Sequence, residues 1–192
     1  MSNIKLNSEK ILDYQVCTSG IKKIIKSVDQ WINDDERSCK YFACLNPHAA
    51  VIASEDNIFK ESLQNANFVT ADGIGVVYAS RILKGQIRKR VTGMDVFIGI
   101  NEAIEARGQK HKISCFFLGS TEETLSKIQV EMTKRYPNVH IAGTYSPPYK
   151  PIFSEEDNNK MIQLINESAP DILWIGLTAP KQEKWVYENR SK

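Results

Sequence analysis

The sequence predicts an α/β fold: a Rossmann-like, mostly parallel sheet with helices on both faces. Three observations favour this class. Short apolar runs alternate with longer segments in which apolar residues recur at helical spacing. These runs are nearly continuous, as expected of parallel strands that are buried on both faces. The connections are short, and a chain of 192 residues has the size of one domain, which we place at residues 1–192.

The first half of the chain contains two strand ends with polar residues. Residues 1–19 are polar with one apolar patch, so we expect an arm or an edge hairpin there. The spacing over 20–32 predicts a helix with Ser19 as its N-cap. An apolar strand over 41–45 is stopped at Pro47. The next expected elements are a helix over 49–66, a strand over 67–69 and a helix over 76–83.

The second half reads as a basic loop and a helix followed by a βαβαβ series. Thr92 is placed to cap the first of these helices, and Gly108 to end it. Gly119 ends the next strand, and Ser120 with Glu123 forms a capping-box pattern that also resembles a phosphate cradle. Expected strands lie at 113–118, 139–142 and 171–175, and expected helices at 92–107, 120–136, 155–167 and from Pro180 onward. Ser154 is expected to cap the helix over 155–167.

In a parallel sheet the segments that follow the strands meet at one edge, where ligands bind. We therefore expect Asn46, Asp72, Gly119 and the residues after Ile175 to converge. Lys181 and Gln182 follow that last strand at the start of a helix, where a diphosphate or a sugar amide could be held.

The segment Thr70–Gly75 carries the main functional hypothesis. Asp72 comes where a strand turns into a helix, and Gly73 lets the backbone turn and a substrate approach closely. We expect Asp72 to be a catalytic base at a nucleotide-sugar site. The alternative is structural, because Asp-Gly is also a common turn and N-cap signal. A dinucleotide site is disfavoured, because Tyr78 stands where the third glycine of that fingerprint belongs.

Composition excludes several classes of function. A formal net charge of +2 predicts no extended nucleic-acid surface, although a local basic cluster is present at Arg81, Lys84, Arg88, Lys89 and Arg90. That cluster fits either a solvated surface or a site for phosphates or anionic lipids. No run approaches the ~20 apolar residues of a membrane span, and no signal peptide is recognisable, so we expect a cytoplasmic location.

The sequence predicts neither a metal site nor a cofactor. The three histidines at 48, 111 and 140 are scattered, no Cys-x-x-Cys pair occurs, and Asp-x-Asp is absent. Cys44 and His48 are four residues apart, but Cys44 lies in an apolar run, where a buried structural cysteine is the simpler interpretation.

Five separated motifs in order closely resemble the bacterial WecG/TagA/CpsF glycosyltransferase family. They are Asn46, Thr70–Gly75, Arg90–Asp95, Phe117–Ser120 and Gly176–Glu183. The resemblance covers nearly the whole chain. It implies inverting, metal-independent transfer of an N-acetylmannosamine-type sugar from UDP to polyprenyl-diphosphate-linked N-acetylglucosamine, in the synthesis of teichoic acid, common antigen or capsule.

The resemblance also implies roles for individual residues. Asp72 matches the proposed base, Asn46 a residue at the sugar end of the pocket, and Arg90 and Gln182 further pocket residues. Cys44 stands where a family threonine is expected, and a thiol is the weaker hydrogen-bonding group. With these we count Thr70, Gly73, Gly119 and Lys181 as candidate substrate-binding residues.

Family members continue beyond the last motif into an Arg-rich tail that is linked to membrane contact. We therefore expect this chain to represent the core, with peripheral attachment to the inner face of the bacterial plasma membrane mainly through that tail. The resemblance also implies a homo-oligomer. Two other functions stay open at this stage: a nucleotide-binding module without catalysis, and an NAD-dependent oxidoreductase.

Overall fold

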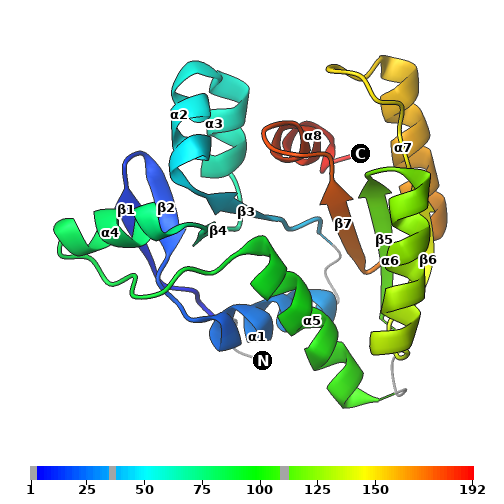
Figure 1. The fold of residues 1–192 in the computed structure, drawn as a ribbon, viewed down its shortest axis with the longest axis horizontal. Helices are drawn as coiled ribbons and strands as arrows, with labels where there is room; N and C mark the ends of the chain where they lie inside the picture. Colours follow the sequence, from blue (N-terminus) through cyan, green and yellow to red (C-terminus); the bar gives the residue numbers. More distant parts are fainter. Residues whose placement is uncertain (1–3, 35–37, 109–112) are drawn as a thin grey trace. The chain divides into compact units, whose positions relative to one another are not determined.

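A computed structural model describes residues 4–34, 38–108 and 113–192 and confirms an α/β fold (Figure 1). The described chain divides into two compact units, residues 1–100 with 179–191 and residues 101–178 with 192. The assignment of residues 1–192 to one glycosyltransferase core domain stays a prediction. The elements, in chain order, are β1 (Ser8–Ile11), β2 (Tyr14–Cys17), α1 (Ile21–Ile32), β3 (Phe42–Leu45), α2 (Pro47–Glu55), α3 (Asn57–Gln64), β4 (Phe68–Ala71), α4 (Ile74–Ile82), α5 (Gly93–Arg107), β5 (Ser114–Gly119), α6 (Glu122–Arg135), β6 (His140–Tyr145), α7 (Glu155–Ser168), β7 (Ile172–Gly176) and α8 (Lys181–Asn189).

The first unit is built on a sheet with strand order β1-β2-β4-β3. β1 and β2 form an antiparallel hairpin at one edge, which confirms one of the two readings of residues 1–19. β4 runs parallel to both of its neighbours, β2 and β3. The strands that carry the candidate site are therefore parallel, as the sequence predicted.

β4 is buried along its whole length, which explains its apolar composition. Val69 and Ala71 belong to the core formed with α2, α3 and α4. On the opposite side, the Phe68 ring stacks on Phe42 at 5.3 Å and lies 5.5 Å from Trp31 of α1. Helices thus cover both faces of this sheet, as expected for parallel strands.

The second unit contains a three-stranded parallel sheet of order β6-β5-β7. α6 and α7 contact this sheet (Figure 1). Phe116, Phe117 and Leu118 of β5 are buried. Among the described residues the strands thus form two sheets, where the sequence analysis expected one. The order of strands depends on non-local pairing, which periodicity along the chain does not report.

Several helix boundaries differ from the prediction, and three of them have a clear local cause. The helix expected over 49–66 is broken at Asp56, whose backbone is extended and whose side chain accepts a hydrogen bond from the Phe59 N–H at 3.0 Å. Gly20, rather than Ser19, precedes α1. Thr121, rather than Ser120, caps α6, because Ser120 has a left-handed backbone with φ of 62°. Asx and Ser/Thr side chains compete for such caps, so neighbouring candidates are hard to separate by sequence.

Other helix ends confirm the prediction. The Thr92 hydroxyl accepts from the Asp95 N–H at 3.0 Å, and Ser154 forms a capping box with Asp157. Gly108 follows α5 with φ of 71°. Within the described ranges, none of the helices has both the length and the apolar character to cross a bilayer.

Candidate active site

Asn46 and Asp72 lie next to each other at the carboxyl edge of the first sheet. They directly follow Leu45 and Ala71, which are paired in the parallel ladder between β3 and β4. The Asp72 N–H extends that ladder by donating to the Leu45 carbonyl at 2.8 Å. The prediction that these two strand ends converge is confirmed.

The helices that follow the two strands also begin side by side. A Cβ at Gly73, whose φ is +134°, would lie 3.4 Å from the Asn46 Cβ, and a Cβ at Gly75 would lie 2.6 Å from the Pro47 Cγ. The glycines therefore permit close approach of α4 to the start of α2. Asn46 caps α2 through its Oδ1, which accepts from the Ala49 N–H at 2.8 Å. Neither helix carries an acidic residue in its first turn, so both N-termini stay attractive to an anion.

Asp72 is half-buried beside a cation. The Val91 N–H donates to the Ala71 carbonyl at 2.9 Å, and this bond holds the segment that contains Arg90 along the end of β4. Burial raises the pKa of the Asp72 carboxyl above its usual value, the Arg90 charge opposes this rise, and Asp95 adds to it. Desolvation that favours the protonated form is the condition that turns a carboxylate into a better proton acceptor.

Cys44 on β3 lies beside Thr70 on β4, and both are candidate substrate-binding residues. Its Sγ accepts a hydrogen bond from the Thr70 hydroxyl at 3.3 Å, and a Cβ at Gly93 would lie 3.5 Å from it. Thr70 is 1% exposed and is the partner of Cys44 in the β3–β4 ladder, so its hydroxyl orients the thiol from the neighbouring strand. Burial raises the pKa of Cys44 to about 11, with further contributions from the charges of Asp72 and Glu183. The thiol therefore stays protonated near neutral pH, as a structural cysteine does.

α8 brings Lys181 and Gln182 into the first unit. The helix lies along α3, where the Lys184 ammonium pairs with Asp56 at 2.7 Å and the Tyr187 hydroxyl donates to Glu61 at 3.2 Å. Both Lys181 and Gln182 are half-buried in the first turn. The Gln182 Nε2 donates to the Glu183 Oε1 at 3.0 Å.

Glu183, in the same turn, is a buried acidic residue that was not predicted from the sequence. It is 7% exposed, and burial raises the pKa of its carboxyl. A glutamate in the first turn of a helix is usually a surface residue, so the sequence alone favoured that reading. One feature of the sequence did argue against a capping role. Glu183 stands three residues after Pro180, and proline has no N–H that could donate a capping hydrogen bond to the glutamate.

Gly119 belongs to the second unit, and its conformation has a local explanation. It has φ of +111°, and a Cβ there would collide with the carbonyl oxygen of Gly176 at the end of the neighbouring strand. The Ser120 N–H donates to that same carbonyl at 3.1 Å. Close approach of β5 and β7 thus accounts for the glycine, and its role as a substrate contact stays a prediction.

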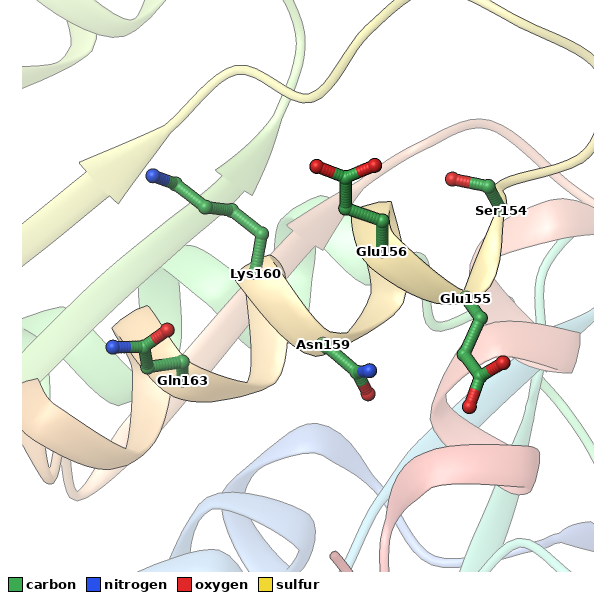
Figure 2. A pocket seen from close by; sticks show the side chains of 6 residues that line it. All are labelled: Ser154, Glu155, Glu156, Asn159, Lys160 and Gln163. Atoms are coloured by element: carbon green, nitrogen blue, oxygen red, sulfur yellow. The ribbon is translucent and has the colours of Figure 1, made fainter.

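A hollow of about 620 Å³ lies on α7 of the second unit. Figure 2 shows that its lining side chains come from α7 and from Ser154, which caps that helix, and that they project to different sides. They are Ser154, Glu155, Glu156, Asn159, Lys160 and Gln163. None is a predicted site residue, and the mixed charges of a solvated helix surface explain the set.

A metal centre has no candidate ligands in the part of the chain that the structure describes. No group of three or more His, Cys, Asp or Glu side chains is arranged there to hold an ion. His111 lies outside the described residues. The groups that do converge in the first unit are a half-buried carboxylate, a cation and two helix N-termini, which suit proton abstraction beside an anionic leaving group.

Comparison with known proteins gives this arrangement a family. A sequence profile described as "Glycosyl transferase WecG/TagA/CpsF family" matches residues 9–192. A Bacillus subtilis (strain 168) protein named N-acetylglucosaminyldiphosphoundecaprenol N-acetyl-beta-D-mannosaminyltransferase is 30% identical over 156 residues, which cover 81% of this chain and 57% of that protein. A Staphylococcus aureus (strain NCTC 8325 / PS 47) protein of the same name is 23% identical over 182 residues, 95% of this chain and 68% of that protein. The chain thus spans between about half and two thirds of these relatives' length, and it belongs to the WecG/TagA/CpsF glycosyl transferase family.

Proposed function

We propose that this protein is an inverting glycosyltransferase that moves an N-acetylmannosamine-type sugar from UDP to polyprenyl-diphosphate-linked N-acetylglucosamine. Support for the substrates comes from the names of the Bacillus and Staphylococcus relatives. Support for the chemistry comes from one observation: the half-buried Asp72 carboxylate lies at the end of β4, with the Arg90 charge close enough to influence its pKa.

In the proposed mechanism Asp72 removes the proton of the acceptor hydroxyl as the glycosidic bond forms. A sugar hydroxyl is a weak nucleophile, and a positioned base contributes roughly 10²–10⁴ in rate. Attack from the face opposite the departing UDP inverts the anomeric carbon. Asn46 lies beside Asp72 at the adjacent strand end, where it suits a contact to the transferred sugar.

The UDP that leaves is an anion and requires donors already in place. Arg90 and the adjacent N-termini of α2 and α4 supply positive potential in the first unit. Lys181 and Gln182 at the start of α8 are proposed as further contacts. We propose that these groups act without a metal ion or an organic cofactor. Addition of a chelator tests this, and an unchanged rate is expected.

Product analysis tests the proposed reaction. Purified protein is incubated with UDP-N-acetylmannosamine and a polyprenyl-diphosphate-linked N-acetylglucosamine, and the lipid product is identified by mass spectrometry. We expect a disaccharide lipid and free UDP. Binding of UDP without product would instead indicate a nucleotide-binding module, and binding of NAD in place of UDP an oxidoreductase.

We also propose peripheral attachment to the inner face of the plasma membrane, where a polyprenyl acceptor resides. The exposed basic residues support an anionic surface as partner; they are Arg81, Lys84, Arg88, Lys89 and Arg90. Co-sedimentation with vesicles tests this, and binding that does not increase with anionic lipid would contradict it. Assembly into a homo-oligomer, proposed from the family resemblance, is tested by sedimentation equilibrium.

A further inference from the structure

A second buried carboxyl group lies in the first unit, in the first turn of α8, and its role rests on the proposed function. Glu183 is the third residue of α8 and is 7% exposed. Its Oε1 accepts from Gln182, but its buried Oε2 has no hydrogen-bond partner among the described residues. Glutamate is almost never buried unless it is paired, and an unsatisfied buried acceptor destabilises a fold. An external donor is the simplest way to satisfy this oxygen.

Helix capping does not explain the carboxyl group. A glutamate at the third position of a helix normally accepts from the N–H of the N-cap residue. Here the N-cap is Pro180, which has no N–H. The helix dipole favours a negative charge at this end, but it supplies no hydrogen for the Oε2 atom. The nearby Lys184 ammonium is engaged with Asp56 at 2.7 Å.

The location of Glu183 links it to the proposed site. The Cys44 thiol at the end of β3 lies within electrostatic range of both the Asp72 and the Glu183 carboxyl groups. These two acids thus lie near one strand end, with the thiol close to both. A diphosphate would be repelled by two carboxylates, whereas hydroxyl or amide groups of a neutral sugar are suitable donors.

We propose that Glu183 binds the transferred sugar, its free Oε2 accepting a hydrogen bond from a ring hydroxyl or from the acetamido N–H. The residue then selects UDP-sugars that have a hydrogen-bond donor at that position, and it orients the sugar toward Asp72. A site built to accept such a bond discriminates strongly against ligands that lack the donor, because its buried oxygen is then left unpaired. UDP alone makes no contact with Glu183.

Binding measurements on matched variants test this assignment. Glu183→Gln, Glu183→Ala and the control Glu188→Gln are titrated with UDP and with UDP-N-acetylmannosamine by calorimetry. Glu188 is exposed on the same helix. For both Glu183 variants we expect affinity for UDP within twofold of wild type. Affinity for the UDP-sugar should fall about 10- to 100-fold, the loss of a hydrogen bond to a charged group. The control should match wild type for both ligands.

Two results would overturn the inference. One is unchanged affinity for UDP-N-acetylmannosamine in Glu183→Gln; the other is a parallel loss for UDP and for the UDP-sugar, which indicates a structural role. Glu183→Gln keeps the size of the side chain, so it yields a folded protein if Glu183→Ala does not. If the wild-type protein binds no UDP-sugar, the proposed function itself is overturned. If the wild-type protein binds UDP-N-acetylmannosamine, the variants test the role of Glu183 separately.

Discussion

Two strand-to-helix turns in this protein look alike in sequence and differ in chemistry. The turn after β4 contains Gly73 with φ of +134°, and the turn after β5 contains Gly119 with φ of +111°. In both, the absence of a side chain permits close approach of another strand end or helix start. Only the first turn has a half-buried carboxylate beside a cation. A glycine-rich turn therefore indicates tight geometry, and the ionisable neighbours indicate where chemistry takes place.

The helix that follows each turn strengthens this contrast. α6 begins with Glu122 and Glu123, whose charges already satisfy the helix dipole and repel a phosphate. α4 has no acidic residue in its first turn and no side-chain cap. Its N-terminus is consequently the better anion site. Four predictions test this difference between the two turns.

The largest effect is expected at Asp72. Asp72→Asn should lower the rate of sugar transfer by about 10²–10⁴ while UDP still binds, because the amide cannot accept the acceptor's proton. Glu122→Gln at the other turn should leave the rate within twofold. Steady-state kinetics and UDP calorimetry measure both. Loss of folding in Asp72→Asn, seen by circular dichroism, would favour the capping role instead.

Alanine at the two glycines should separate them by stability. Gly119→Ala combines a left-handed backbone with a collision against the Gly176 carbonyl, so we expect a loss of about 3 kcal/mol or more in the free energy of unfolding. Gly73→Ala adds a Cβ 3.4 Å from Asn46, and about 1–2 kcal/mol is expected. Urea denaturation checks the order. An equal or greater loss for Gly73→Ala would contradict it.

A smaller effect concerns the Cys44 thiol of β3, whose pKa is influenced by Asp72 at the first turn. With a pKa of about 11, roughly one Cys44 in a thousand is ionised at pH 8, so alkylation should be slow. Cys39 serves as the internal reference, because its side chain is exposed even though partial burial of the thiol raises its pKa as well. Mass spectrometry after iodoacetamide treatment should find Cys39 modified well before Cys44. Faster modification of Cys44 would indicate a reactive nucleophile and revive its pairing with His48.

Much of this contrast could be predicted from the sequence. The apolar run over 67–69 indicated a strand, which the structure extends to Ala71, and parallel strands place their following residues at one edge, so the proximity of Asn46 and Asp72 followed. The capping patterns at Thr92 and Ser154 correctly predicted where two helices begin, because only one suitable side chain preceded each helix.

The features that the sequence did not predict depend on contacts between distant segments. Burial of Glu183 requires α8 to dock on α3, which Lys184 and Asp56 help to hold although they are 128 positions apart. The left-handed Ser120 follows from the approach of Gly119 to Gly176. Local spacing carries no record of either contact, and the division of the strands into two sheets was missed for the same reason.

The pH dependence of sugar transfer tests the role of Asp72 most directly. A base must be ionised, and the pKa of Asp72 is raised by burial, so kcat/KM should begin to fall at a higher pH than an ordinary aspartate would impose. Arg90 lowers this pKa and Asp95 raises it, so Arg90→Gln should move the acidic limb to higher pH and Asp95→Asn to lower pH. Opposite shifts in the two variants are the result we predict. An acidic limb that stays in place in both would contradict the assignment of Asp72 as the catalytic base.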